Sequence, residues 1–136
     1  MIYAVIDTTV IVSALLTKHV DSSTARVVQS MMTGEFTPLY NDEILDEYSQ
    51  VLRRAKFHFS EPIVQKYLNV IKKIGIKSSR LHSDEHFPDP KDIVFYEVAM
   101  SKEDAYLVTG NTKHFPAKPI VVTPAELMEI LDKSEA

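Results

Sequence analysis

The chain has 136 residues, of which 45% are hydrophobic, so we expect one domain with a buried core over residues 1–136. It contains no cysteine, which excludes disulfide bonds and thiolate metal sites, and the net charge is -4. No apolar run approaches the roughly 20 residues of a membrane span, and residues 1–7 lack the basic segment of a secretory signal, so we expect a cytoplasmic protein with no membrane contact.

Strand and helix signals alternate along the chain. Short apolar runs predict strands, and stretches with apolar residues at helical spacing predict helices. In chain order, the predicted elements are a strand over residues 2–7, helix or loop over 8–17, a helix over 22–33, a strand over 36–40, helices over 41–54 and 60–74, a weak strand over 76–81, a polar loop over 82–91, a helix to about 101, strands over 106–108 and 120–122, and a helix to about 131. This order predicts a three-layer α/β/α sandwich with a mostly parallel sheet of about five strands.

Capping residues mark the predicted starts of these helices. Asn41 and Ser60 are good N-caps, and Asp89 is a cap followed by proline at the first helical position. Residues 123–126, Thr-Pro-Ala-Glu, form a capping box, which clearly predicts the last helix.

The charge is unevenly distributed. Residues 53–80 carry eight basic side chains and one acid, a net charge of +7, whereas the remainder carries -11. A basic band beside an acidic pocket suits a polyanion held by its phosphates. The competing interpretation is a solvated helix face whose lysines have no specific role.

Four acidic or amide residues stand where a strand should end or a helix begin. They are Asp7, Glu47, Asp92 and Asn111. The carboxyl ends of parallel strands lie on one edge of the sheet, where ligands bind, so these residues would meet. Three carboxylates that meet repel one another unless a cation lies between them, and hard oxygen ligands favour Mg²⁺ or Mn²⁺. The pattern therefore predicts a metal site.

Each of these residues also has a structural interpretation. Asp7 could cap the next segment, and Asp89 is a natural helix cap. Glu43 and Glu47 lie on one face of a helix, where acids near its start complement the dipole. Asn111 after a glycine is also typical of a turn.

Other catalytic machinery is not evident in the sequence. There is no G-x-S-x-G motif, and three glycines do not form a phosphate loop or dinucleotide fingerprint. His114 is a candidate base, but a lone histidine is more often structural, and the other four histidines lack ligand spacing.

Taken in order, these motifs resemble those of the PIN domain family. The matching segments are residues 7–10, 47–52, 89–92 with Phe95 and Ala99, and 107–111 with His114 and Phe115. No single motif is specific, but the four in this order and spacing are, and they cover nearly the whole chain. More narrowly, the chain resembles the toxin-type PIN proteins of prokaryotic toxin–antitoxin systems, the VapC-like ribonucleases.

The resemblance implies an endoribonuclease that depends on Mg²⁺ or Mn²⁺. Its three catalytic, metal-binding acids fall on Asp7, Glu47 and Asp92, and a fourth metal position falls on Asn111. The residues expected to support the site are Thr8, Thr109, Glu43 and Asp89, and those expected to contact nucleic acid are Arg53, Arg54 and Lys56.

Two positions depart from the family's pattern. Family members usually have asparagine where Thr9 stands, and many have aspartate where Asn111 stands. The second change removes a negative charge, so we expect one metal held firmly and a second held weakly or only with substrate. The resemblance further implies a single-stranded or looped RNA substrate, a homodimer or higher homo-oligomer, and a small antitoxin partner.

Three alternatives remain open. A PIN fold without catalysis would act as a binding or regulatory module, although all three acids are present. A phosphotransfer domain also begins with a strand and an aspartate, but Thr9 replaces the second acid of the haloacid-dehalogenase type, and Lys118 is only a faint match to the receiver lysine. An oligomeric structural subunit is the third.

Overall fold

The structure, a computed structural model, describes residues 1–134, so the last two residues of the predicted domain lie outside the described range. Within that range, five parallel strands form one sheet in the order β3-β2-β1-β4-β5. The strands are β1 (Tyr3–Ile6), β2 (Thr37–Tyr40), β3 (Ile76–Lys77), β4 (Tyr106–Val108) and β5 (Val121–Val122). The predicted fold class is confirmed.

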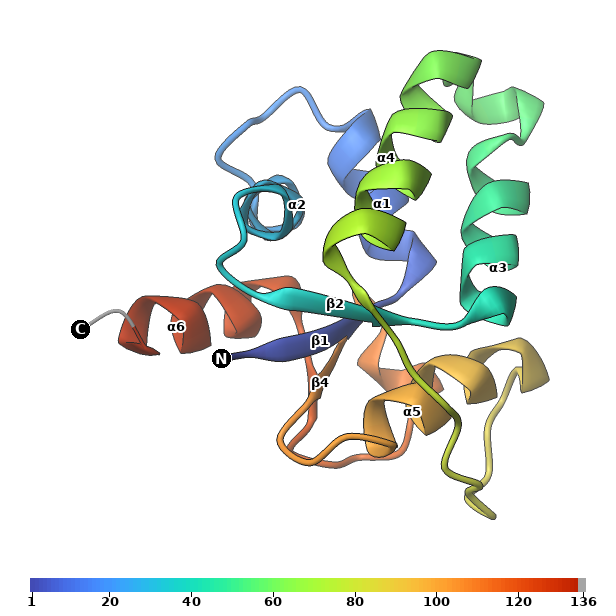
Figure 1. Cartoon of the computed structure of the whole chain (residues 1–136), viewed down its shortest axis with the longest axis vertical. Coiled ribbons are helices and arrows are strands. Elements are labelled where there is room, and N and C mark those ends of the chain that lie inside the picture. The colour runs from blue at the N-terminus through green and yellow to red at the C-terminus, as the bar shows by residue number, and fades with distance from the viewer. Residues whose placement is uncertain (135–136) are drawn as a thin grey trace.

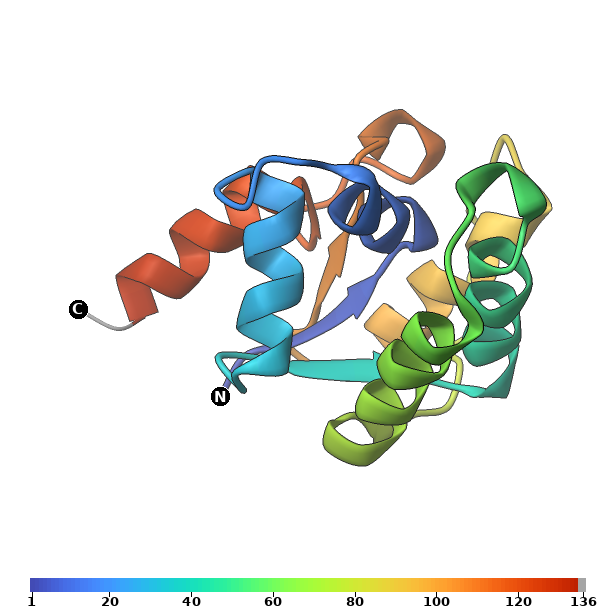
Figure 2. The same cartoon turned by 90° about the horizontal axis from the view of Figure 1, so that it is seen from above.

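Helices cover both faces of the sheet. They are α1 (Thr8–Leu16), α2 (Ser23–Met32), α3 (Asp42–Leu52), α4 (Glu61–Ile74), α5 (Ile93–Met100) and α6 (Pro124–Ser134). In Figure 1, α1 to α4 lie above the sheet and α5 lies below it. Seen from above, α3 and α4 lie side by side at one end of the molecule, and α2 and α6 lie at the other (Figure 2). None of the helices in the described range has the length and apolar character needed to cross a bilayer.

Most of the predicted caps form the expected bonds. The Asn41 side chain accepts a hydrogen bond from the Ile44 N–H at 2.8 Å. Thr123 and Glu126 bond each other's backbone N–H groups at 2.9 and 3.1 Å, which is the reciprocal pattern of a capping box. Ser60 occupies the N-cap position of α4, but its side chain makes no capping bond.

The third strand is shorter than predicted. α4 ends at Gly75, a position that only glycine fits, because a Cβ there would lie 2.5 and 2.8 Å from the backbone oxygens of Ile71 and Pro38. β3 then pairs with β2 over Ile76 and Lys77 only. Its brevity also explains how Pro38 fits into β2, since no residue of β3 pairs in register with this proline.

Two other elements differ in detail from the prediction. The segment 8–17, which fits helix or loop, forms α1 up to Leu16, with Thr17 as its C-cap. The helix expected directly after Asp89 begins instead with a 3₁₀ turn, η2 (Pro90–Asp92), before α5 starts at Ile93.

α5 is more deeply buried than its apolar stripe predicts. The sequence predicts four inward residues, whereas the structure buries six of eight: Val94, Phe95, Tyr96, Glu97, Val98 and Ala99. One side of α5 packs against the sheet, and the polar loop covers another, where Phe87 packs edge-on against Tyr96. A glutamate is therefore buried in the middle of this helix.

The strand order creates a crevice at one edge of the sheet. From β1 the chain builds β2 and β3 on one side and then returns to add β4 and β5 on the other. In such sheets, ligands bind outside the carboxyl ends of the two strands where the order reverses. Here those strands are β1 and β4, and Ile6 is in register with Val108, so Asp7 and Thr109 emerge next to each other.

Candidate active site

Asp7 lies at this crevice and is held there by hydroxyl groups. Although it occupies the N-cap position of α1, its side chain makes no capping bond. Its Oδ2 instead accepts hydrogen bonds from Thr109 Oγ1 at 2.7 Å and Thr9 Oγ1 at 3.0 Å. Asp7 is only 6% exposed, and a buried carboxylate is costly unless its oxygens are bonded. The structure thus excludes a side-chain capping role for Asp7.

Asp92 is the least satisfied acid of the site. Its Oδ2 is buried and makes no hydrogen bond of good geometry, and His114 Nδ1 lies 3.4 Å away. Burial, followed by the negative charges of Asp7 and Asp89, raises the pKa of Asp92 to about 6, and His114 only partly opposes this shift. A buried, unbonded carboxylate oxygen in a negative field fits a site that a cation would stabilise.

Glu47 shares a cavity with Asp92. This acidic cavity has a volume of about 420 Å³ and is lined by residues of α1, α3, η1 (Ala55–Phe57) and η2 and by their neighbours. Its lining residues are Thr8, Thr9, Val12, Ser13, Glu47, Val51, Arg54, Phe57, Asp89, Lys91 and Asp92. Glu47 also lines a second cavity, of about 320 Å³, with Glu43 and Arg80.

Tyr48 ties the helix that carries Glu47 to the carboxyl end of β1. Its hydroxyl donates a hydrogen bond to the carbonyl oxygen of Ile6, the residue before Asp7. Burial and then the negative charge of Asp7 raise the pKa of Tyr48 well above its usual value. α3 is therefore anchored beside Asp7 through the neighbour of Glu47.

The acids do not close into a complete ligand set. Within residues 1–134, no three or more Asp, Glu, His or Cys side chains are grouped so that they could hold a metal ion. Asp7 and Asp92 interact electrostatically, and Glu47 and Asp92 line one cavity, whereas Asn111 is exposed. The N–H of Asn111 donates to Thr109 Oγ1 at 3.0 Å, which links this residue to Asp7 through one hydroxyl.

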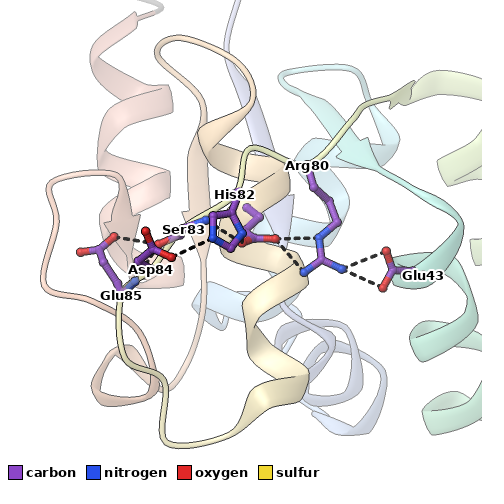
Figure 3. Close-up of polar contacts among 7 residues, drawn as sticks. Glu43, Arg80, His82, Ser83, Asp84 and Glu85 are labelled. Carbon is purple, nitrogen blue, oxygen red and sulfur yellow. Dashed lines mark hydrogen bonds and ion pairs between the residues drawn. The ribbon is translucent and has the colours of Figure 1, made fainter.

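The remaining supporting residues take different places. Asp89 caps η2 by accepting a hydrogen bond from the Lys91 N–H at 3.0 Å. Thr8 is buried, and its hydroxyl has no hydrogen-bond partner in the described part of the chain. Glu43 faces Arg80, whose Nη1 lies 2.9 and 3.0 Å from its two carboxylate oxygens (Figure 3).

Arg80 connects Glu43 to a buried acid of α5 that the sequence analysis did not single out. Glu97 accepts hydrogen bonds from Arg80 Nε at 2.8 Å and from the Ser83 N–H at 2.7 Å. Burial pushes the pKa of Glu97 upward, but the Ser83 N–H and Arg80 outweigh it and hold this pKa below its usual value. The sequence signal was present, because Glu97 is the only charged residue in the apolar stretch 93–100.

Replacing Arg80 by methionine is expected to lower the free energy of unfolding by about 1–2 kcal/mol near neutral pH. The substitution leaves the carboxylate of Glu97 buried without its cation, and Ser83 compensates for only part of the loss. Arg80 is 34% exposed, so solvent screening reduces the cost below that of a fully buried pair.

Urea denaturation at several pH values would test this. The lowered pKa of Glu97 means that its stabilisation is present above the usual glutamate pKa and is lost as the pH falls below it. The difference between wild type and Arg80→Met should therefore shrink on acidification. A difference in stability that is independent of pH would contradict the assigned contact. Lys66 is an exposed cation of α4, and Lys66→Met is the matched control.

The three predicted nucleic-acid contacts differ in availability. Arg53 Nη2 is bound to Glu61 at 2.7 Å, and this bond lowers the pKa of Glu61 to about 2, so the charge of Arg53 is already paired. Arg54 is exposed, lines the acidic cavity and has no ion-pair partner among residues 1–134. Lys56 is also exposed and places its Nζ 5.1 Å from the centre of the Phe57 ring.

Comparison with known proteins identifies the family. A model of the PIN domain matches residues 3–113, which include Asp7, Glu47, Asp92 and Asn111. No sequence among curated proteins matches this chain significantly. PIN domains are in general nucleases that use divalent metal ions. The matched range covers most of the chain, and with the parallel sheet and the acids at its switch point it shows that this protein belongs to the PIN domain family.

Proposed function

We propose that this protein is an endoribonuclease dependent on Mg²⁺ or Mn²⁺, and that it acts as the toxin of a toxin–antitoxin system. The observation that carries the catalytic part is the buried Oδ2 of Asp92, which among the described residues has only His114 nearby, makes no hydrogen bond of good geometry and lies in the negative field of Asp7 and Asp89. The toxin part rests on the resemblance of its motifs to the VapC-like ribonucleases.

Each of the predicted ligands has its own role in the proposed site. Asp7 and Asp92 would hold the ion, Glu47 would complete its ligands from the cavity wall, and Asn111 would add a neutral oxygen. When bound, the ion would stabilise negative charge on the attacked phosphate and lower the pKa of a water. Because the acids of residues 1–134 form no complete ligand set here, this arrangement requires Glu47 to turn toward Asp92 when the ion binds.

The chain's own residues supply orientation and proton transfer. Thr109 and Thr9 fix the Asp7 carboxylate, and Tyr48 fixes α3. Glu47 lines the cavity and would accept the proton of an attacking water as general base. Arg54 would bind a flanking phosphate, because its charge has no partner within the described residues.

Apolar surface supports a protein partner or a second copy of the chain. Leu16 and Val20 are 51% and 77% exposed. Val20 also lines a small groove with Val28 and Tyr67. An exposed apolar residue beside a groove is compatible with the proposed antitoxin or homodimer.

A non-catalytic PIN module is the second candidate. In residues 1–134 no complete acidic ligand set is formed, and Asn111 replaces the acid that many family members carry. Such a module would bind RNA through its cations without cutting it.

Incubation of the purified protein with a structured RNA separates the two candidates. We expect fragments with Mn²⁺ or Mg²⁺ and none with EDTA, because the acids cannot stabilise the attacked phosphate alone. Isothermal titration with Mn²⁺ should show binding in the same buffer. A protein that binds neither ion and leaves RNA intact would contradict the catalytic proposal and favour the binding module.

A further inference from the structure

Two residues that line the acidic cavity, Phe57 and Lys91, have no role in the proposed function. Besides its acids, the cavity is lined by Arg54, Phe57 and Lys91. Phe57 ends η1, the short turn between α3 and α4, so it lies close in sequence to the helix that carries Glu47. The chemistry of the acids gives no reason for an aromatic ring at this position.

The hydrophobic core does not explain Phe57. Its ring stacks on Phe59, with centroids 5.6 Å apart and planes inclined by 18°. Phe59 packs against the core, whereas Phe57 is not among the described residues that do. Phe57 is thus partly buried and held by a stacking contact, and it contributes a ring to the cavity instead of to the interior.

One cation without an ion-pair partner in the described residues lies over this ring, and two more line its cavity. Lys56 Nζ lies over the ring, 5.1 Å from its centre, and Arg54 and Lys91 line the same cavity. None of the three has an ion-pair partner within residues 1–134, in contrast to Arg53, Lys77 and Arg80. Aromatic rings interleaved with free cations are what proteins use to bind single strands, since the rings stack bases and the cations hold phosphates.

We propose that Phe57 is a base-stacking residue, so that a nucleobase next to the phosphate at the acids takes the place over its ring that the ammonium of the exposed Lys56 has here. Arg54 and Lys91 then contact the phosphates on either side. The inference rests on the proposed function for its ligand, which is RNA. It also specifies the class of substrate, because a duplex hides the faces of its bases whereas single strands and loops expose them.

Binding of short oligonucleotides to the full chain tests the proposal. Fluorescence anisotropy would compare a single-stranded RNA with an abasic strand of equal length, in Mg²⁺ and in an Asp7→Asn background that leaves the RNA intact. Phe57→Leu should weaken binding of the RNA by about 5- to 100-fold and leave binding of the abasic strand unchanged, because only the RNA has bases to stack. Phe57→Tyr should restore binding.

Tyr3→Leu is the matched control for this experiment. Tyr3 is a partly buried aromatic residue with Lys102 Nζ 4.2 Å from its ring centre, and it packs against the core. It starts the central strand β1, whose other end leads to Asp7, so it lies away from the acids. Its replacement should not alter the difference between the two strands. Thermal unfolding of Phe57→Leu should match that of wild type, since Phe57 does not pack against the core.

The outcomes distinguish this inference from the proposed function. If wild type cuts RNA but Phe57→Leu binds both strands as its parent does, or loses affinity for both equally, the stacking role is wrong and the nuclease proposal stands. If RNA binds with the predicted dependence on Phe57 but wild type never cuts it, the stacking role stands and catalysis fails. If neither strand binds, both are overturned.

Discussion

Replacing Asp7 by asparagine is expected to reduce metal-dependent RNA cleavage by more than about a hundredfold, because even residues that only support metal ligands cost 10- to 100-fold when lost. The amide keeps an oxygen that can accept the Thr109 and Thr9 hydroxyls, so the local structure should survive. It loses the charge that a cation needs. Initial rates in Mn²⁺ measure the loss, and thermal unfolding checks the fold.

A matched acid controls for general charge effects. Asp21 is exposed, and its side chain forms no ion pair or hydrogen bond within residues 1–134, so Asp21→Asn should retain full cleavage. Both variants are purified identically, so contaminating nuclease would appear equally in both. If Asp7→Asn cuts within a few-fold of wild type, the catalytic centre lies elsewhere and the proposed site is wrong.

The fold was predictable because its signals are local. The capping box at Thr123 and Glu126 fixes the start of α6 within four residues of sequence, and Asn41 does the same for α3. Apolar runs mark β1 and β4 as buried strands regardless of what surrounds them. Their parallel pairing follows from the helices between them, and it is what brings Asp7 next to Thr109.

The contacts made by long side chains were not predictable in the same way. Arg80 reaches Glu43 and Glu97, which lie 37 and 17 residues away in sequence, and the path of a polar loop decides both contacts. Arg53 and Arg54 are adjacent, yet only Arg53 meets Glu61 of the next helix. Net charge along residues 53–80 therefore overstates the charge available to a polyanion.

The environment of His114 depends on the fold in a similar manner. A lone histidine after β4 has no sequence partner, so a structural role was the better interpretation. In the structure its Nδ1 lies 3.4 Å from Asp92 Oδ2, because η3 (Thr112–His114) follows the strand next to β1. The position of His114 beside the acids is therefore a feature of the fold.

Replacing Asp92 by asparagine is expected to stabilise the metal-free protein by about 1–2 kcal/mol at pH 7–8, although it removes a proposed metal ligand. The pKa of Asp92 is raised from 3.8 to about 6, so between these values the folded state holds the proton more tightly than the unfolded state does. The stability of the wild type therefore falls as the pH rises through this window, and the amide avoids the loss. The Asp92 side chain is 17% exposed, so screening by water keeps the gain in stability below the value that the full change in its pKa would give.

Denaturation curves from pH 3.5 to 8 in EDTA, and again with Mn²⁺, would measure both effects of Asp92→Asn. The variant and the wild type should have equal stability below about pH 4 and should diverge as the pH rises through the raised pKa of about 6, at which half of the Asp92 carboxylate is charged. Mn²⁺ at a hundred times its dissociation constant should stabilise the wild type by about 2.7 kcal/mol and the variant far less.

A variant that is less stable than wild type in EDTA at pH 8 would show that the Asp92 carboxylate is already satisfied within the protein. In that case its unpartnered oxygen would no longer support a cation site. If Mn²⁺ stabilises the wild type but no EDTA-sensitive cleavage is seen, Asp92 would instead belong to a binding module whose acids hold an ion only for structure.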